Sequence, residues 1–163
     1  SGDLDEYKLQ TLLTAHAPID GFGIGTALDV SNDAPALDCA YKLQEFAGKP
    51  KRKRSEGKAT WPGRKQVYRM FDRDGCMSGD TVALENGDPQ QGAPLLQPFM
   101  HAGKRLHPKP SLHALRQQTL LHYQSLPAAM IAMDCTDNYP VAISTTLQAL
   151  TAQLDREQLK LDR

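Results

Sequence analysis

The sequence has no surplus of charge of either sign, because its 163 residues include 19 Lys and Arg and 19 Asp and Glu. Proteins dedicated to nucleic acids or to acidic membrane surfaces usually carry a marked basic excess, so this balance argues against both kinds of partner. Long apolar runs are also missing. The longest, Ala128–Met133, is about a third of the roughly 18 residues that a membrane span needs. We therefore expect no membrane partner, and nucleic acid only through a local patch.

Cysteine is scarce, and its spacing forms no familiar motif. Cys39, Cys76 and Cys135 are odd in number, widely separated and without a C-x-x-C pair. This pattern predicts neither a disulfide framework nor a structural zinc site, and it favours a reducing, cytoplasmic location. The five histidines show no H-x-x-x-H or H-E-x-x-H spacing, so no metal site is predicted. No secretory leader opens the chain, and its first residue is Ser1, so we expect further residues upstream.

The first 35 residues have the pattern of a helix followed by a short strand. Asp3 can cap a helix, with Glu6 as the return partner of a capping box, and the apolar helical pattern stops at Ala17-Pro18. Residues 19–24 then read as a short strand that ends in Gly25-Thr26. A helix followed directly by a glycine-ended strand is the second half of a βαβ unit.

From residue 36 to the end, the pattern changes to short strands and then helices. Closely spaced turn signals between the strands, among them Asp72-Arg73-Asp74-Gly75, are typical of antiparallel sheet. The candidate strands are Tyr41–Phe46, Val67–Phe71 and Thr81–Leu84. Pro110-Ser111 can start one helix that runs to Pro127, and Ser144 can cap another with an apolar stripe of Leu147, Leu150, Leu154 and Leu161. We predict two parts, residues 1–35 and 36–163.

Two glycine-bearing turns are the candidate ligand site. Gly2 and Asp3 form the first, and Gly23, Gly25 and Thr26 form the second, each at the C-terminal end of an expected parallel strand. Ligands collect at such strand ends, where glycine lets backbone N–H groups approach a phosphate closely. The alternative is a pair of tight turns that bind nothing, since one G-x-G pattern is a weak signal.

The run of basic residues Lys49–Arg54 has two interpretations. It is typical of a nuclear-localisation or nucleic-acid patch, and Trp61 and Tyr68 supply aromatic side chains nearby. Basic side chains of this kind are also typical of a solvated edge strand, where they prevent pairing with another sheet. The second interpretation is favoured because acidic residues elsewhere cancel the charge.

Several motifs together resemble nicotinate phosphoribosyltransferases, over the C-terminal part of that family's chain and in the same order. They are Ser1–Glu6, Ala17–Thr26, Asp33–Leu37, Tyr41–Leu43, Lys53–Arg69 and Pro94–Leu96. The resemblance implies that residues 1–35 are the end of an α/β barrel, which this chain is too short to close alone. The fold class expected is therefore α/β or α+β: a βαβ remnant of an incomplete barrel, a mostly antiparallel region and two C-terminal helices.

The resemblance also implies the activity. Such an enzyme joins nicotinate to phosphoribosyl pyrophosphate with ATP hydrolysis and Mg²⁺, makes nicotinate mononucleotide for NAD biosynthesis, and is expected to be a homodimer. Gly23, Gly25 and Thr26 would hold the 5′-phosphate, and Gly2 and Asp3 would lie near the ribose. The catalytic residues would lie upstream, so this chain alone is predicted to be inactive.

Two alternatives stay open at this point. One is a related nicotinamide or quinolinate phosphoribosyltransferase. The other is a non-enzymatic module that binds nucleic acid through Lys49–Arg54. The sequence departs from the family where it has Lys51, Arg52 and Arg54 in place of the usual apolar residues. This departure concerns packing or partner contacts rather than the glycine motifs.

Overall fold

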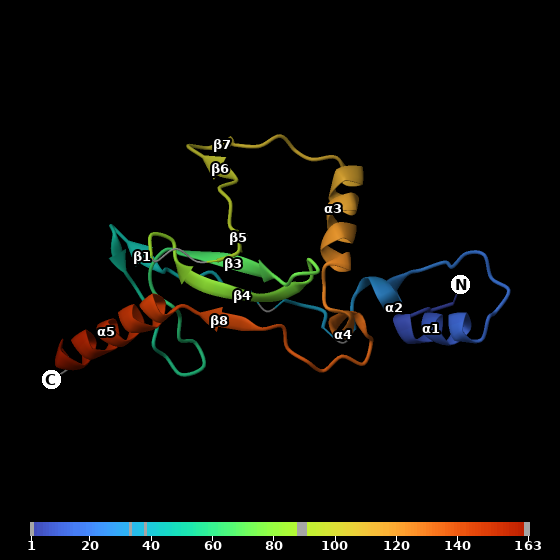
Figure 1. The fold of residues 1–163 in the computed structure, drawn as a ribbon, viewed down its shortest axis with the longest axis horizontal. Helices are drawn as coiled ribbons and strands as arrows, with labels where there is room; N and C mark the ends of the chain where they lie inside the picture. The colour runs from blue at the N-terminus through green and yellow to red at the C-terminus, as the bar shows by residue number, and fades with distance from the viewer. Residues whose placement is uncertain (1, 33, 38, 88–90, 162–163) are drawn as a thin grey trace. The chain divides into compact units, whose positions relative to one another are not determined.

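The computed structural model describes residues 2–32, 34–37, 39–87 and 91–161. The chain forms two compact units, Ser1–Tyr41 and Lys42–Arg163 (Figure 1). Ser1 and Asp33, which carry part of the family motifs, lie outside the described residues. The assignment of residues 1–35 to the end of a barrel stays a prediction.

The first unit contains helices α1 (Glu6–Thr14) and α2 (Thr26–Asp29). The predicted cap at Asp3 is wrong, because the Asp5 carboxylate caps α1 and accepts the amide hydrogen of Lys8 at 2.8 Å. An N-cap side chain reaches the amide three residues on, and from Asp5 that amide belongs to Lys8.

The strand predicted over residues 19–24 is not present as a strand, and the described residues of the first unit contain none. A strand needs a neighbouring strand for its backbone hydrogen bonds, and the described part of this unit offers no such neighbour. The segment instead has no regular secondary structure before Gly25, which is the N-cap of α2.

A four-stranded sheet is the centre of the second unit (Figure 1). Its order is β5-β3-β4-β8, with β3–β4 and β3–β5 antiparallel and β4–β8 parallel. The strands are β3 (Lys65–Phe71), β4 (Met77–Leu84), β5 (Ala93–Pro94) and β8 (Val141–Ile143). The predicted strands in the β3 and β4 regions are confirmed and longer than expected. β5 and β8 were not predicted, because two or three residues carry no readable alternation.

The turn that joins β3 to β4 fixes how these strands pair. The Asp72 carboxylate accepts the amide hydrogens of Asp74 at 3.0 Å and Cys76 at 2.8 Å, and Gly75 adopts a φ of 82°. Asp in this role and glycine at positive φ are what a tight turn requires. The predicted turn at residues 72–75 is therefore confirmed.

Two small hairpins lie outside the main sheet. β1 (Glu45–Phe46) pairs with β2 (Lys49–Pro50), and β6 (Met100–His101) pairs with β7 (Lys104–Arg105), both antiparallel. The strand predicted over residues 41–46 is thus reduced to its last two residues.

Both predicted C-terminal helices are confirmed, with their caps. Ser111 caps α3 (Leu112–Gln124) through the amide of Ala114 at 3.1 Å. The hydroxyl of Ser144 accepts from the amide of Leu147 at 3.3 Å, at the start of α5 (Thr145–Leu161). A four-residue helix between them, α4 (Ala128–Ile131), was not predicted.

The apolar face of α5 packs on the sheet. Leu147 is completely buried, as is Ala83 of β4, and Leu150 and Leu154 are half-buried. The side chain of Leu161 lies outside the described part of the chain. The predicted leucine stripe is therefore confirmed over the three residues that can be judged.

We expect Leu147→Ala to lower the free energy of unfolding by about 2–5 kcal/mol, because it removes buried methyl groups and leaves a cavity. Leu159→Ala on the same helix is the matched control. Its side chain is 64% exposed, so its effect should stay within about 0.5 kcal/mol. Urea unfolding followed by circular dichroism measures both, and equal effects would contradict the placement of α5.

Candidate functional site

The first glycine turn is open and has an unusual backbone. Gly2 has a φ of 125° and Asp3 a φ of 51°, so both use the left-handed side of φ that glycine tolerates best. The Asp3 side chain is 82% exposed. The ammonium group of Lys8 donates to the backbone carbonyl of Asp3 at 2.7 Å and lies 3.9 Å from the Asp3 carboxylate. Asp3 therefore keeps carboxylate oxygens available as hydrogen-bond acceptors.

The second glycine turn leads into α2. The amides of Leu28 and Asp29 both donate to the carbonyl of Gly25, so the amides of Thr26 and the residue after it precede the helical ladder. A Cβ built on Gly25 would meet nothing within 4 Å, so the space beside the turn is open. α2 is too short for a large dipole, which leaves the amides and the Thr26 hydroxyl as the groups that could contact a phosphate.

Nothing in the described residues joins these two turns. No hydrogen bond or ion pair links Gly2 or Asp3 to the segment Gly23–Thr26 there. A single phosphoribosyl site built from both turns therefore stays a prediction.

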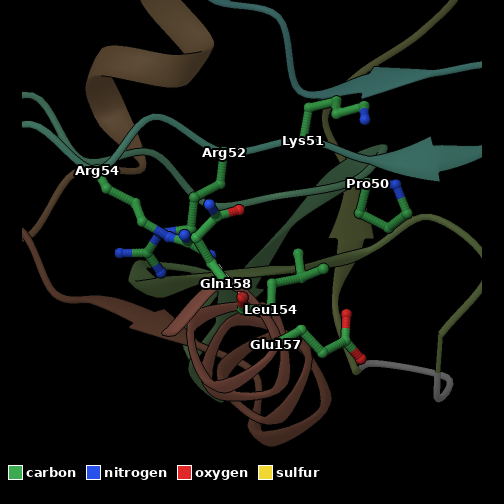
Figure 2. Close-up of a pocket in the computed structure, with 7 residues that line it drawn as sticks. All are labelled: Pro50, Lys51, Arg52, Arg54, Leu154, Glu157 and Gln158. Atoms are coloured by element: carbon green, nitrogen blue, oxygen red, sulfur yellow. Dashed lines mark hydrogen bonds between the residues drawn. The ribbon is translucent and has the colours of Figure 1, made fainter. Parts of the chain in front are cut away.

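The basic run lies beside the C-terminal helix in the second unit and lines a cavity of about 210 Å³ (Figure 2). Arg52 and Arg54 point toward α5, and Lys51 points away from it. The cavity is lined by Pro50, Lys51, Arg52 and Arg54 on one side and by Leu154, Glu157 and Gln158 of α5 on the other.

One carboxylate of α5 holds both arginines. Asp155 lies 3.3 Å from Nη1 of Arg52 and accepts a hydrogen bond from Nε of Arg54 at 2.8 Å. Arg54 also donates to the backbone carbonyl of Leu154. The Arg52 side chain is 15% exposed, and its Nε is buried without a hydrogen-bond partner. These contacts attach the loop after β2 to the helix.

The solvated-strand interpretation of the basic run is therefore wrong for Arg52, whereas Arg54 is exposed although Asp155 pairs with it. The lysines of the run, Lys49, Lys51 and Lys53, are exposed, as the solvated interpretation expects. The nucleic-acid interpretation is also weakened, because Asp155 already pairs with both arginines that would contact phosphate groups.

If Asp155 anchors the loop, Arg52→Ala should destabilise the second unit, and Lys53→Ala should change the free energy of unfolding by less than about 0.5 kcal/mol. A double-mutant cycle of Arg52→Ala with Asp155→Ala should give a coupling of about 0.2–1 kcal/mol, since Asp155 is 39% exposed. Additive effects in urea unfolding would show that the pair contributes nothing.

A second charged network connects β3, β4 and the segment before β8. The β3–β4 register places Arg69 opposite Asp80, and two parallel hydrogen bonds join them, Nε to Oδ1 at 2.9 Å and Nη2 to Oδ2 at 2.8 Å. The Tyr139 hydroxyl donates to Oδ1 of Asp80 at 3.1 Å, and the guanidinium carbon lies 5.7 Å from the centre of the Tyr139 ring. Asp80 is buried, at 8% exposure.

The network changes the ionisation of its members. The hydrogen bonds from Arg69 are the main reason why the pKa of Asp80 lies below its usual range. Burial, with Asp80 as a further cause, raises the pKa of Tyr139. Sequence reasoning did not single out Asp80 or Tyr139. The signal that could have found Asp80 is the turn at residues 72–75, which sets the pairing of the two strands.

We expect the free energy of unfolding to fall at acid pH, in part because Asp80 becomes protonated. A carboxyl group with a lowered folded pKa contributes stability above its unfolded pKa of about 3.9, and the contribution is lost as the pH falls through the folded pKa. The Asp80→Asn variant should be less stable than the unchanged chain at pH 7. Its free energy of unfolding should also fall less steeply below about pH 4, because the carboxyl group that titrates there is missing. Asp74→Asn, in the exposed turn, is the control. A pH profile unchanged by Asp80→Asn would contradict the assignment.

Three further findings concern the described residues. They include no group of three or more His, Cys, Asp or Glu side chains placed to hold a metal ion. None of the helices there is long and apolar enough to cross a membrane. The three cysteines are free thiols.

Comparison with known proteins identifies the family. A family model described as the nicotinate phosphoribosyltransferase C-terminal domain matches residues 86–151. Nicotinate phosphoribosyltransferase pncB2 of Mycobacterium tuberculosis is 42% identical over 156 residues, which cover 94% of this chain. The chain belongs to the nicotinate phosphoribosyltransferase family, as a C-terminal portion. It spans about a third of that relative's length, at 33%.

Other members of the nicotinate phosphoribosyltransferase family agree. The enzyme of Bos taurus is 31% identical over 181 residues, covering 94% of this chain and 33% of its own length. The crystal structure of human nicotinic acid phosphoribosyltransferase superposes with a TM-score of 0.61 and 26% identity, over 71% of this chain and 26% of that one. The family predicted from the motifs is confirmed. The matched C-terminal domain contains β8, α3 and α4, but not the glycine turns.

Proposed function

We propose that this chain is the C-terminal part of an enzyme that forms nicotinate mononucleotide from nicotinate and phosphoribosyl pyrophosphate. The step uses ATP hydrolysis, and it serves the salvage route to NAD in the cytoplasm. The complete enzyme is a homodimer. The observation that supports this proposal most is the 42% identity to a nicotinate phosphoribosyltransferase over 94% of the chain.

The glycine turns are proposed to bind the phosphoribosyl end of the substrate. Backbone amides at Gly23, Gly25 and Thr26, with the Thr26 hydroxyl, hold the 5′-phosphate. At the other turn Gly2 leaves room for the ribose, whose hydroxyls donate to the Asp3 carboxylate. The open space beside Gly2 and Gly25 supports this assignment, because a phosphate or sugar must approach the backbone closely.

These contacts suit the chemistry of the reaction. The anomeric carbon becomes positive as pyrophosphate departs, so catalysis depends mainly on positioning and on charge stabilisation. Binding energy at the distant phosphate can orient that carbon toward the nicotinate nitrogen. Mg²⁺ would neutralise charge on the departing pyrophosphate. The described residues offer no carboxylate cluster for it, so no residue of this chain is assigned to Mg²⁺ or ATP.

The proposal is tested by measuring which pyridine base the full-length enzyme joins to phosphoribosyl pyrophosphate. Nicotinate should be used, with ATP consumed, and the 163-residue chain alone should show no activity because the donors from other strands are missing. Preferred use of nicotinamide or quinolinate by the full-length enzyme would overturn the assignment of the base. Nicotinate mononucleotide formed by the short chain alone would overturn the assignment of catalytic residues to another part.

A residue-level prediction concerns the second glycine turn. Gly25→Val in the full-length enzyme should raise the Michaelis constant for phosphoribosyl pyrophosphate by about ten- to a hundredfold, the cost of one charge-assisted phosphate contact of roughly 1.5–3 kcal/mol. Gly25 has a φ of −148°, outside the left-handed region that only glycine adopts readily, so valine adds no strain from a positive φ. The loss should come from crowding of the phosphate alone.

Gly21→Val is the matched control, because a Cβ there also meets nothing within 4 Å. It should leave the Michaelis constant within about twofold, as expected for a surface substitution. Equal melting temperatures for the two variants confirm that both fold. If Gly25→Val behaves like Gly21→Val, the phosphate does not bind at this turn.

A further inference from the structure

A second cavity in the second unit has a different character from the basic one. Its volume is about 450 Å³, and it lies between α3, the α4 segment and the network of Arg69 and Tyr139. Its apolar wall contains Met77, Leu126 and Met130, and Tyr123 contributes an aromatic ring. Met77 is buried at 4% exposure, whereas Tyr123 is 51% exposed at the rim. The volume falls within the range of small-molecule sites, roughly 300–1,000 Å³.

One face of α3, with the residue Leu126 beyond its end, supplies four of the eight residues that line the cavity. Thr119, His122, Tyr123 and Leu126 follow one another at helical spacing, so they lie on the same side of the helix and its end. The amide of Met77 donates to the carbonyl of Ser125 at 2.7 Å, which fixes the end of α3 to the start of β4. The wall is therefore held in place by a backbone hydrogen bond.

The charged side of the cavity is also fixed. Arg69 is held by two hydrogen bonds to Asp80, and the Tyr139 hydroxyl donates to the same carboxylate. The guanidinium charge is paired with the Asp80 charge, so the pair adds no net charge to the cavity. Arginine carries more N–H donors than one carboxylate accepts, and Arg69 can therefore still donate to a neutral acceptor.

We propose that this cavity binds a small, neutral, planar aromatic molecule that has a hydrogen-bond acceptor on its rim. The aromatic ring stacks against Tyr123 and Tyr139 and contacts the methionine sulfurs, which are favourable partners for aromatic rings. The acceptor faces Arg69 and His122. This site is independent of the proposed phosphoribosyl site, whose residues belong to the first unit.

The test titrates the ¹⁵N-labelled 163-residue chain with benzamide, which has a flat ring and a carbonyl acceptor. Cyclohexanecarboxamide carries the same amide on a ring that is not flat. Benzamide should shift the Met77 and Tyr123 amide signals saturably below about 10 mM, a range reasonable for so small a ligand. The non-aromatic amide should bind several-fold more weakly.

Three variants locate the site. Tyr123→Ala should weaken benzamide binding about tenfold by removing the stacking ring. Thr119→Phe should abolish binding by filling the cavity. Leu121→Ala, at a 65% exposed position that does not line the cavity, is the control and should bind as the unchanged chain does.

The proposal is overturned if benzamide produces no saturable shifts, or if both amides bind equally well. It is also overturned if Tyr123→Ala and Thr119→Phe bind benzamide as the unchanged chain does. Circular dichroism confirms that each variant is folded. Because the readout needs no enzyme activity, its failure would leave the proposed phosphoribosyl transfer unaffected, and failure of that activity would leave this site unaffected.

Discussion

The pairing of Arg69 with Asp80 is the interaction on which most of the second unit depends. It forms only in one register of β3 on β4, because a shift by one residue would turn each side chain to the other face of the sheet. Tyr139 donates to the same carboxylate just before β8 begins, and β8 then pairs in parallel with β4. One buried carboxylate thus connects the central hairpin to the chain that leads into α5.

The edge of β3 that pairs with β5 needs a glycine, Gly92, directly before β5. A Cβ on Gly92 would lie 2.5 Å from the carbonyl oxygen of Arg69, and the φ of Gly92 is 106°. The close approach lets β5 pair with β3 directly after this residue, with Ala93 opposite Arg69. Both strands that flank the β3–β4 hairpin, β5 and β8, therefore meet it beside the Arg69–Asp80 pair. The same pair holds the Arg69 and Tyr139 side chains that line the cavity.

α5 is held at two places by different forces. Leu147 is buried in the core near its start, and Asp155, about two turns further on, pairs with Arg52 and Arg54. The resemblance to the family led us to expect apolar residues where these arginines stand. Their long side chains cover the helix with methylene groups, and their charged ends meet a carboxylate. Asp155 on α5 thus balances the charge that the two arginines bring to this surface.

Much of the fold could be predicted from local sequence signals, and the rest could not for identifiable reasons. The Asp72 turn, the serine caps of α3 and α5 and the leucine stripe are local, so they were found correctly. The cap of α1 was placed two residues early because Asp3 and Asp5 are both good caps, and only the backbone decides between them. The contacts of Asp155 and Tyr139 join residues far apart in the chain, and no local pattern reports them.

The two candidate sites differ in how far residues of this chain hold them in one conformation. In the first unit Leu4 alone among the described residues is buried, so packing there cannot hold the glycine turns in one arrangement. A phosphate cradle needs such support, because catalysis depends on the positions of its donors. The cavity beside Tyr123 and Tyr139 is bounded instead by an ion pair whose carboxylate is buried and by a backbone hydrogen bond of the same unit. The binding proposed there therefore needs only this chain, whereas the phosphoribosyl transfer proposed for the complete enzyme depends on packing that the first unit does not provide by itself.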